Sequence, residues 1–132
     1  MKYFCNPLNV DYRYQFNQQV MPGLGEGAIE VSREAADPSM IYFKGKYYIF
    51  ASMTLGVWVS EDMANWEAKR LPDNLPFYDY APDVRVLGDY VYFSASKRGE
   101  PCNFYRTKNI EEGPYEEIKG TFDFWDPNLF VD

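Results

Sequence analysis

Short apolar runs separated by tight polar turns follow one another along most of the chain from residue 38 onward. The runs are rich in tyrosine, phenylalanine, valine and isoleucine, which favour β-strands. Glycines mark several turns between them, and Gly88-Asp89 has the glycine-first order of a two-residue hairpin turn. The pattern predicts consecutive antiparallel strands over residues 40–43, 47–51, 57–60, 66–69, 84–87, 90–95, 103–107 and 115–118.

These strands fall into two similar sets of four, so the chain contains an internal repeat. Gly45 and Tyr47 match Gly88 and Tyr90 at an offset of 43 residues. A period near 44 residues with four strands per unit is typical of a β-propeller blade. We therefore expect an all-β propeller, and a small β-sandwich made from the same strands is the alternative fold.

The repeat divides the chain into an irregular N-terminal segment at 1–33, a first blade at 34–76, a second blade at 77–121 and the start of a third blade at 122–132. A propeller needs about four or more blades to close its ring. We therefore expect this chain to be the front portion of a larger protein, or to pack against copies of itself or another chain. In the second case the chain could self-associate through the open edges of the incomplete propeller.

Composition excludes several kinds of catalytic chemistry. The chain has no histidine and only two cysteines, which removes Ser-His-Asp triads, Cys-His pairs and zinc sites built from these residues. Carboxylates are the main catalytic groups that remain, with tyrosines, lysines and arginines. The net charge of −7 argues against nucleic acid and anionic membranes as partners, whereas a neutral carbohydrate suits an acidic cleft.

The chain shows no sign of membrane insertion. No stretch approaches the roughly 20 apolar residues of a membrane span, and the N-terminus lacks the apolar region of a signal peptide. The expected location is cytoplasmic, or secreted or periplasmic if a signal peptide was removed.

Two Asp-Pro pairs are the strongest candidates for function. Asp37-Pro38 and Asp126-Pro127 lie 89 residues apart, which equals two repeats, and each precedes an apolar run. Asp83 lies about two residues further along in the corresponding segment, so it keeps the same face of a strand. Since the first strand of each propeller blade lies nearest the axis, we expect these carboxylates to converge. Convergent carboxylates shift each other's pKa values, as one acid and one base acting on a sugar acetal require. The simpler interpretation is that Asp before Pro is common at turns.

Four motifs, in the same order along the chain, resemble glycoside hydrolase family 43. Residues 34–52 resemble the opening blade of that family, and residues 59–66 resemble its Ser-x-Asp-Leu-x-x-Trp segment. Residues 80–84 are similar to its Trp-Ala-Pro-Asp-Val, with Tyr80 in place of Trp, and residues 125–130 resemble its Asp-Pro-x-x-Phe.

The resemblance implies a five-bladed propeller that hydrolyses arabinose- and xylose-containing glycans with inversion, as xylosidases and arabinofuranosidases do. It assigns the general base to Asp37 and the third carboxylate, which tunes and orients the acid, to Asp126. Tyr80 and Trp125 would flank the sugar, and Met53 would form a wall of the pocket. We expect no cofactor, although the sequence leaves open a central cation such as calcium.

The general acid of that family is a Glu that follows the third carboxylate. Glu112, in Glu112-Gly113-Pro114, precedes Asp126, so we do not expect it to be catalytic. We therefore expect the intact protein to be a glycosidase and this chain alone to be inactive. Two alternatives are a non-catalytic carbohydrate-binding propeller, in which the Asp residues only bind hydroxyls, and a protein-interaction propeller. Sucrose- and fructan-cleaving enzymes share the fold but retain configuration and use a different opening motif.

Overall fold

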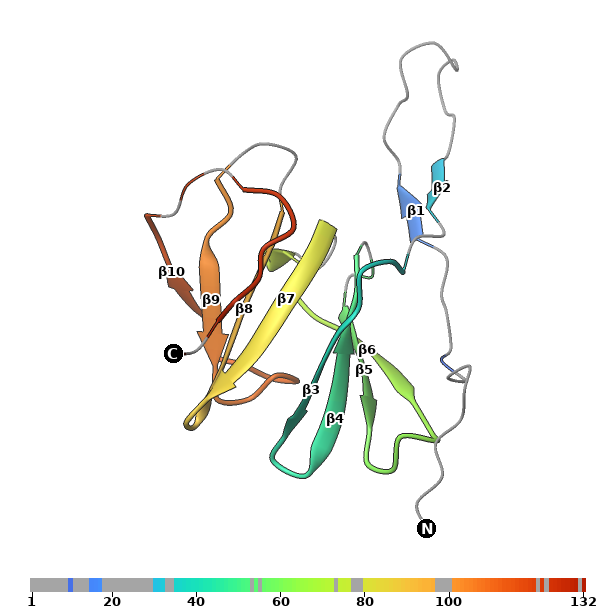
Figure 1. The fold of residues 1–132 in the computed structure, drawn as a ribbon. Coiled ribbons are helices and arrows are strands. Elements are labelled where there is room, and N and C mark those ends of the chain that lie inside the picture. Colours follow the sequence, from blue (N-terminus) through green and yellow to red (C-terminus); the bar gives the residue numbers. More distant parts are fainter. Residues whose placement is uncertain are drawn as a thin grey trace.

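A computed structural model of the chain describes residues 10, 15–17, 30–32, 35–52, 54, 56–72, 74–76, 80–96, 101–120, 122, 124–130 and 132. These residues form an all-β structure without an α-helix (Figure 1). Accordingly, no membrane-spanning helix occurs among them.

The first four-stranded sheet has its strands in chain order and is antiparallel throughout. It consists of β3 (Ser39–Phe43), β4 (Lys46–Phe50), β5 (Gly56–Ser60) and β6 (Glu67–Arg70). Each strand pairs with the next, as in a meander. The four predicted strands of the first repeat are therefore confirmed, with ends shifted by one residue at most of their boundaries.

The second sheet repeats this arrangement. It consists of β7 (Tyr80–Leu87), β8 (Tyr90–Ser96), β9 (Phe104–Thr107) and β10 (Glu116–Ile118), again in chain order. Strand β7 begins at Tyr80, earlier than the predicted start at Val84. The pairing of β7 with β8 shifts register between Tyr80 and Asp83, so a bulge carries the strand past Pro82.

The two inner hairpins use turns that suit their sequences. Lys44 and Gly45, between β3 and β4, both have positive φ (47° and 88°), as a type I′ turn requires. Between β7 and β8, Gly88 has φ 59°, in agreement with the predicted glycine-first turn. Local sequence therefore determines both reversals.

The turn after the third strand is also the same in both sheets. Ser60 Oγ accepts the Asp62 N–H at 3.2 Å, and the Asp62 carboxylate accepts the N–H groups of Ala64 and Asn65. In the second sheet, Thr107 Oγ1 accepts the Asn109 N–H at 3.0 Å, and Asn109 Oδ1 plays the part of the Asp62 carboxylate. Backbone hydrogen bonds hold the pKa of Asp62 far below its usual range. The Ser-x-Asp motif thus builds a turn here.

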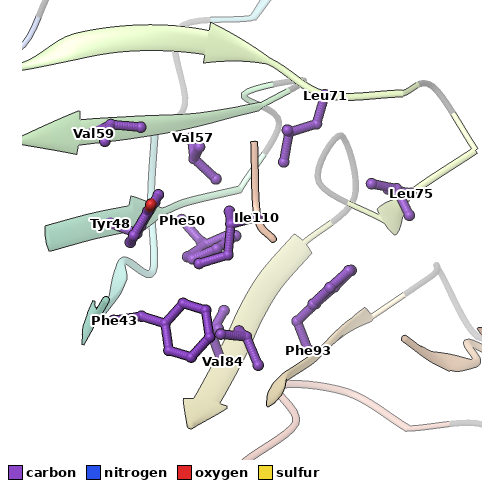
Figure 2. Close-up of a cluster of buried hydrophobic side chains, with 11 residues drawn as sticks. Phe43, Tyr48, Phe50, Val57, Val59, Leu71, Leu75, Val84, Phe93 and Ile110 are labelled. Atoms are coloured by element: carbon purple, nitrogen blue, oxygen red, sulfur yellow. The ribbon is translucent and has the colours of Figure 1, made fainter. Parts of the chain in front are cut away.

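The main hydrophobic core lies between the two sheets (Figure 2). Phe50 of β4 and Phe93 of β8 face each other across it, with ring centroids 6.4 Å apart, and both are almost fully buried. The core residues are Phe43, Tyr48, Phe50, Val57, Val59, Leu71, Leu75, Val84, Val91, Phe93 and Ile110. Side chains of both sheets pack in this one core, so each sheet shields apolar side chains of the other from water and stabilises it.

An ionic cluster joins the sheets at the edge of this core. Glu111, in the β9–β10 connection, binds Lys46 Nζ at 2.8 Å and also contacts Lys69 Nζ and the Tyr48 hydroxyl. Burial raises the pKa of Glu111, but the hydrogen bonds from Lys46, Lys69 and Tyr48 outweigh it and lower the pKa to about 2. The same carboxylate raises the pKa of Lys69.

Two segments differ from the sequence expectations. No strand was expected before residue 34, yet β1 (Gln15–Asn17) and β2 (Glu30–Ser32) pair as a short antiparallel ladder. Conversely, residues 127–130 form no strand, although the start of a third blade was expected there. A strand exists through pairing, and the described residues place no partner strand beside this segment.

The arrangement is that of two neighbouring propeller blades. The first strands of the two sheets, β3 and β7, contact each other, and the C-terminal segment runs back past β7 (Figure 1). The structure is therefore part of a β-propeller, and the inner strands carry the candidate site.

Candidate functional site at the inner strands

The two candidate aspartates occupy equivalent and uncommon backbone positions. Asp37 and Asp126 have positive φ angles (51° and 47°), and Ala81 has the same conformation (φ 47°). All three precede a proline and lie 44 or 45 residues apart. Aspartate tolerates the left-handed region better than most residues. Ala81 is therefore the structural equivalent of Asp37 and Asp126, and the second repeat has no carboxylate at this place.

Two buried serines hold these left-handed residues. Ser52 Oγ accepts the Ala81 N–H at 2.8 Å, and Ser96 Oγ accepts the Asp126 N–H at 2.8 Å. Each serine follows or ends the second strand of one sheet and binds the backbone of the next repeat. The contact therefore recurs with the period of the repeat.

One pocket of about 410 Å³ contains both candidate carboxylates. Asp37 comes from the segment before β3, and Asp126 from the segment that follows the second sheet. Both are exposed. The described lining residues are Asp37, Pro38, Ser39, Met40, Ala81, Pro82, Asp83, Arg85, Asp126, Pro127 and Asn128. The structure thus brings together the two aspartates that the repeat spacing singled out.

Asp83 lines the same pocket but is occupied by structural contacts. It is only 7% exposed. Its Oδ1 accepts from Ser39 Oγ at 3.2 Å and from Arg85 Nη1 at 2.7 Å, and its Oδ2 accepts the Leu129 N–H. Both oxygens are therefore engaged, and Asp83 joins segments of three successive repeats.

The aromatic candidates lie beside this pocket. Tyr80 begins β7 and is partly exposed, while Trp125 precedes Asp126 and is 62% exposed. Neither is among the described residues that line the pocket. Their role as sugar contacts stays a prediction, as do the catalytic roles of Asp37 and Asp126. Met53 lies outside the described residues.

Glu112 occupies a different part of the molecule. It borders a hollow of about 320 Å³ with Lys44, Lys108 and Glu111. No glutamate is among the described residues that line the pocket with Asp37 and Asp126. Glu112 is therefore separated from the two aspartates in this structure.

Metal binding has no support in the part of the chain that the structure describes. No group of three or more His, Cys, Asp or Glu side chains is arranged there to hold an ion.

Sequence reasoning missed three contributors to the site. Ser52 binds Asp37 Oδ2 at 3.2 Å, Ser39 binds Asp83, and Arg85 brings a positive charge to an otherwise acidic pocket. The spacing of Ser52 and Ser96, which is 44 residues, was the available signal for the first of these.

Comparisons with known proteins agree with the fold. Neither family models nor curated proteins match this chain. Among solved structures, the chain is similar to an exo-1,5-alpha-L-arabinanase from a bovine ruminal metagenomic library. The identity is 24% and the TM-score 0.51, over 73% of this chain and 42% of that one.

It is also similar to a bifunctional GH43-CE protein of Bacteroides eggerthii. Here the identity is 23% and the TM-score 0.50, over 67% of this chain and 16% of that one. The chain therefore spans less than half the length of these two proteins. At this level of identity the likeness concerns the fold, which is the propeller fold that the resemblance to glycoside hydrolase family 43 implies.

Proposed function

We propose that this chain supplies part of the active site of a glycoside hydrolase that acts on arabinose- or xylose-containing glycans. The observation that carries the proposal is the shared pocket, in which Asp37 and Asp126 reach the same mouth from equivalent positions two repeats apart. The fold shared with an exo-1,5-alpha-L-arabinanase supports the choice of sugar.

The proposed mechanism is inversion with two carboxyl groups. Asp37 acts as the general base that takes a proton from water, and water attacks the anomeric carbon on the face opposite the leaving group. A separate general acid protonates the leaving oxygen, and inverting enzymes keep acid and base about 6.5–9.5 Å apart. Asp126 acts as the third carboxylate and orients that acid.

The general acid comes from outside the described residues, since no glutamate among them lines this pocket. Without it the leaving group departs unprotonated, which costs about 10²–10⁴-fold in rate. The resemblance to glycoside hydrolase family 43 places this acid after Asp126, where the sequence has no Glu, so we propose that the 132-residue chain alone binds sugar but hydrolyses it negligibly. Aryl arabinofuranosides and xylosides test this, and turnover well above the buffer rate would overturn the assignment of the acid.

Calorimetric titration with 1,5-α-L-arabinotriose and xylotriose tests the site itself. We expect one of them to bind, and we expect Asp37→Asn and Asp126→Asn each to change the affinity measurably but by no more than a few-fold. Asp89→Asn, an exposed aspartate of the β7–β8 turn, is the matched control and leaves it unchanged. Absence of binding, or equal affinity in all four proteins, would contradict the proposal.

A longer protein that includes the acid separates hydrolysis from simple sugar binding. There Asp37→Asn is expected to remove turnover and to keep the substrate affinity within a few-fold. A protein that only binds carbohydrate would instead lose affinity in this variant and show no turnover to lose.

A further inference from the structure

We infer that Ser52 is a positioning residue for Asp37: it links the Asp37 carboxylate to the backbone of the next repeat. The catalytic meaning of this inference rests on the proposed function. Ser52 follows β4 and is 1% exposed. It lies between Asp37 of the first repeat and Ala81 of the second. Its hydroxyl contacts both.

The direction of the two hydrogen bonds follows from their chemistry. The Ala81 N–H can only donate, so Ser52 Oγ accepts it, at 2.8 Å. The hydroxyl has a single proton, which is then free to point at Asp37 Oδ2, 3.2 Å away. The Ser52 hydroxyl therefore accepts from the Ala81 N–H and donates to the Asp37 carboxylate.

A backbone contact fixes Ser52 itself. Its N–H donates to the Ala36 carbonyl at 2.9 Å, so the residue directly before Asp37 is bound to the same serine. Both the backbone before Asp37 and its carboxylate are thus held by one buried residue. In the described part of the chain, Ser52 gives the Asp37 carboxylate its hydrogen bond, through Oδ2, and Oδ1 remains for water or a sugar hydroxyl.

Ser96 makes the same hydrogen bond to the backbone of the next repeat, but its own repeat has no carboxylate at the position of Asp37. It accepts the Asp126 N–H at 2.8 Å, as Ser52 accepts the Ala81 N–H. In its own repeat, however, Ala81 stands where Asp37 stands in the first. The serine at the strand end therefore has a general role in joining repeats, and only Ser52 combines it with a bond to a candidate base.

This arrangement makes the orientation of Asp37 depend on the junction between the two sheets. If the Ala81 N–H moves away, the Ser52 hydroxyl gains another orientation and the bond to Asp37 is no longer enforced. Loss of the hydroxyl should therefore release the side-chain torsion of Asp37 and also expose the Ala81 amide.

Nuclear magnetic resonance of the 132-residue chain tests both effects. Three-bond couplings to the Asp37 β-protons and Cγ report its χ1 torsion, and amide exchange reports on Ala81 and Asp126. We expect a single χ1 rotamer in the wild type and in Ser52→Thr, which keeps the hydroxyl. In Ser52→Ala we expect averaged couplings and about tenfold faster exchange at Ala81, as loss of one hydrogen bond implies.

Two variants serve as controls. Ser96→Ala should speed exchange at Asp126 and leave the couplings of Asp37 unchanged. Ser94→Ala removes another buried hydroxyl, which contacts Asn103 O at 3.3 Å away from the pocket, and should change neither readout. A general loss of stability would act through all three alanine variants, whereas the inference predicts an Asp37 effect in Ser52→Ala alone.

Arabinotriose titration of the same variants links the result to the site. Ser52→Ala should bind a few-fold more weakly than Ser94→Ala. Averaged Asp37 couplings in the wild type, or unchanged couplings in Ser52→Ala, would overturn the inference and leave the proposed function intact. The wild-type couplings decide the matter even if Ser52→Ala does not fold. If the wild type binds neither trisaccharide, the proposed function fails, and the couplings still decide whether Ser52 positions Asp37.

Discussion

Ser39 donates a hydrogen bond of 3.2 Å to Asp83, across the boundary between the first strands of the two sheets. The pair follows the repeat, because Ser39 Oγ accepts the Val84 N–H while Asp83 Oδ2 accepts the Leu129 N–H one repeat later. Each inner strand therefore uses one side chain to bind the backbone of the next.

Removal of the Asp83 carboxylate should destabilise the fold. Asp83→Ala leaves the partly buried Leu129 N–H and Ser39 hydroxyl without an acceptor, and Arg85 without the partner that lies at 2.7 Å in the wild type. We expect a loss of about 2–4 kcal/mol in the free energy of unfolding, measured by urea denaturation. Asp89→Ala, in the exposed turn of the same hairpin, should cost less than about 0.5 kcal/mol. Equal losses in both variants would refute the structural role of Asp83.

The ionic cluster around Glu111 should make the free energy of unfolding depend on pH in the acid range. Its folded-state pKa of about 2 lies below the ordinary value of 4.5. A lowered pKa means that the charged carboxylate stabilises the fold above pH 4.5, and that this contribution disappears as the pH falls from 4.5 towards 2. We expect about 2 kcal/mol, since Lys46 and Lys69 are partly exposed.

Urea midpoints between pH 5 and pH 2.5 measure this effect. Glu111→Gln should be less stable than the wild type at pH 5, and the difference should shrink towards the acid end. Glu112→Gln, at an exposed neighbouring position, should follow the wild-type curve. If Glu111→Gln runs parallel to the wild type over this range, the ion cluster does not hold the two sheets together.

Gly56 should tolerate no side chain, because β5 and β6 approach closely there. A Cβ added at Gly56 would lie 2.0 Å from the Lys69 carbonyl oxygen. Gly56→Ala is therefore expected to cost about 3 kcal/mol or more, since backbone must move. Gly45→Ala has open space around it and a φ of 88°, so only the left-handed strain of about 1–2 kcal/mol remains. Thermal unfolding measures both variants. A lower melting temperature for Gly45→Ala than for Gly56→Ala would contradict this expectation.

The strands could be predicted from the sequence because their signals are local. Alternating apolar residues and the turns at Gly45 and Gly88 determine each hairpin without reference to the rest of the fold. The start of β7 was not predicted, since Pro82 suggests a loop and only pairing across a bulge extends the strand to Tyr80. The strand expected after Asp126 is missing among the described residues for the related reason that pairing needs a partner.

The site was predictable only in part. The spacing of Asp37 and Asp126 places them at equivalent positions of a repeat, and this was enough to bring them to one pocket. The spacing also put Asp83 on the same face, yet whether its oxygens are free depends on distant groups such as the Leu129 N–H. Ser52 has no chemical signature of its own, and its importance appears only when Ala81 packs against it.

The most direct measurement for the central claim is the footprint of arabinotriose on the amide resonances of the chain. If the inner strands form a sugar site, the largest shift changes fall in three separate segments, at residues 37–40, 81–85 and 126–128, and weaken in Asp37→Asn. Changes centred instead on the hollow around Lys46 and Glu111, or no changes at all, would contradict the account.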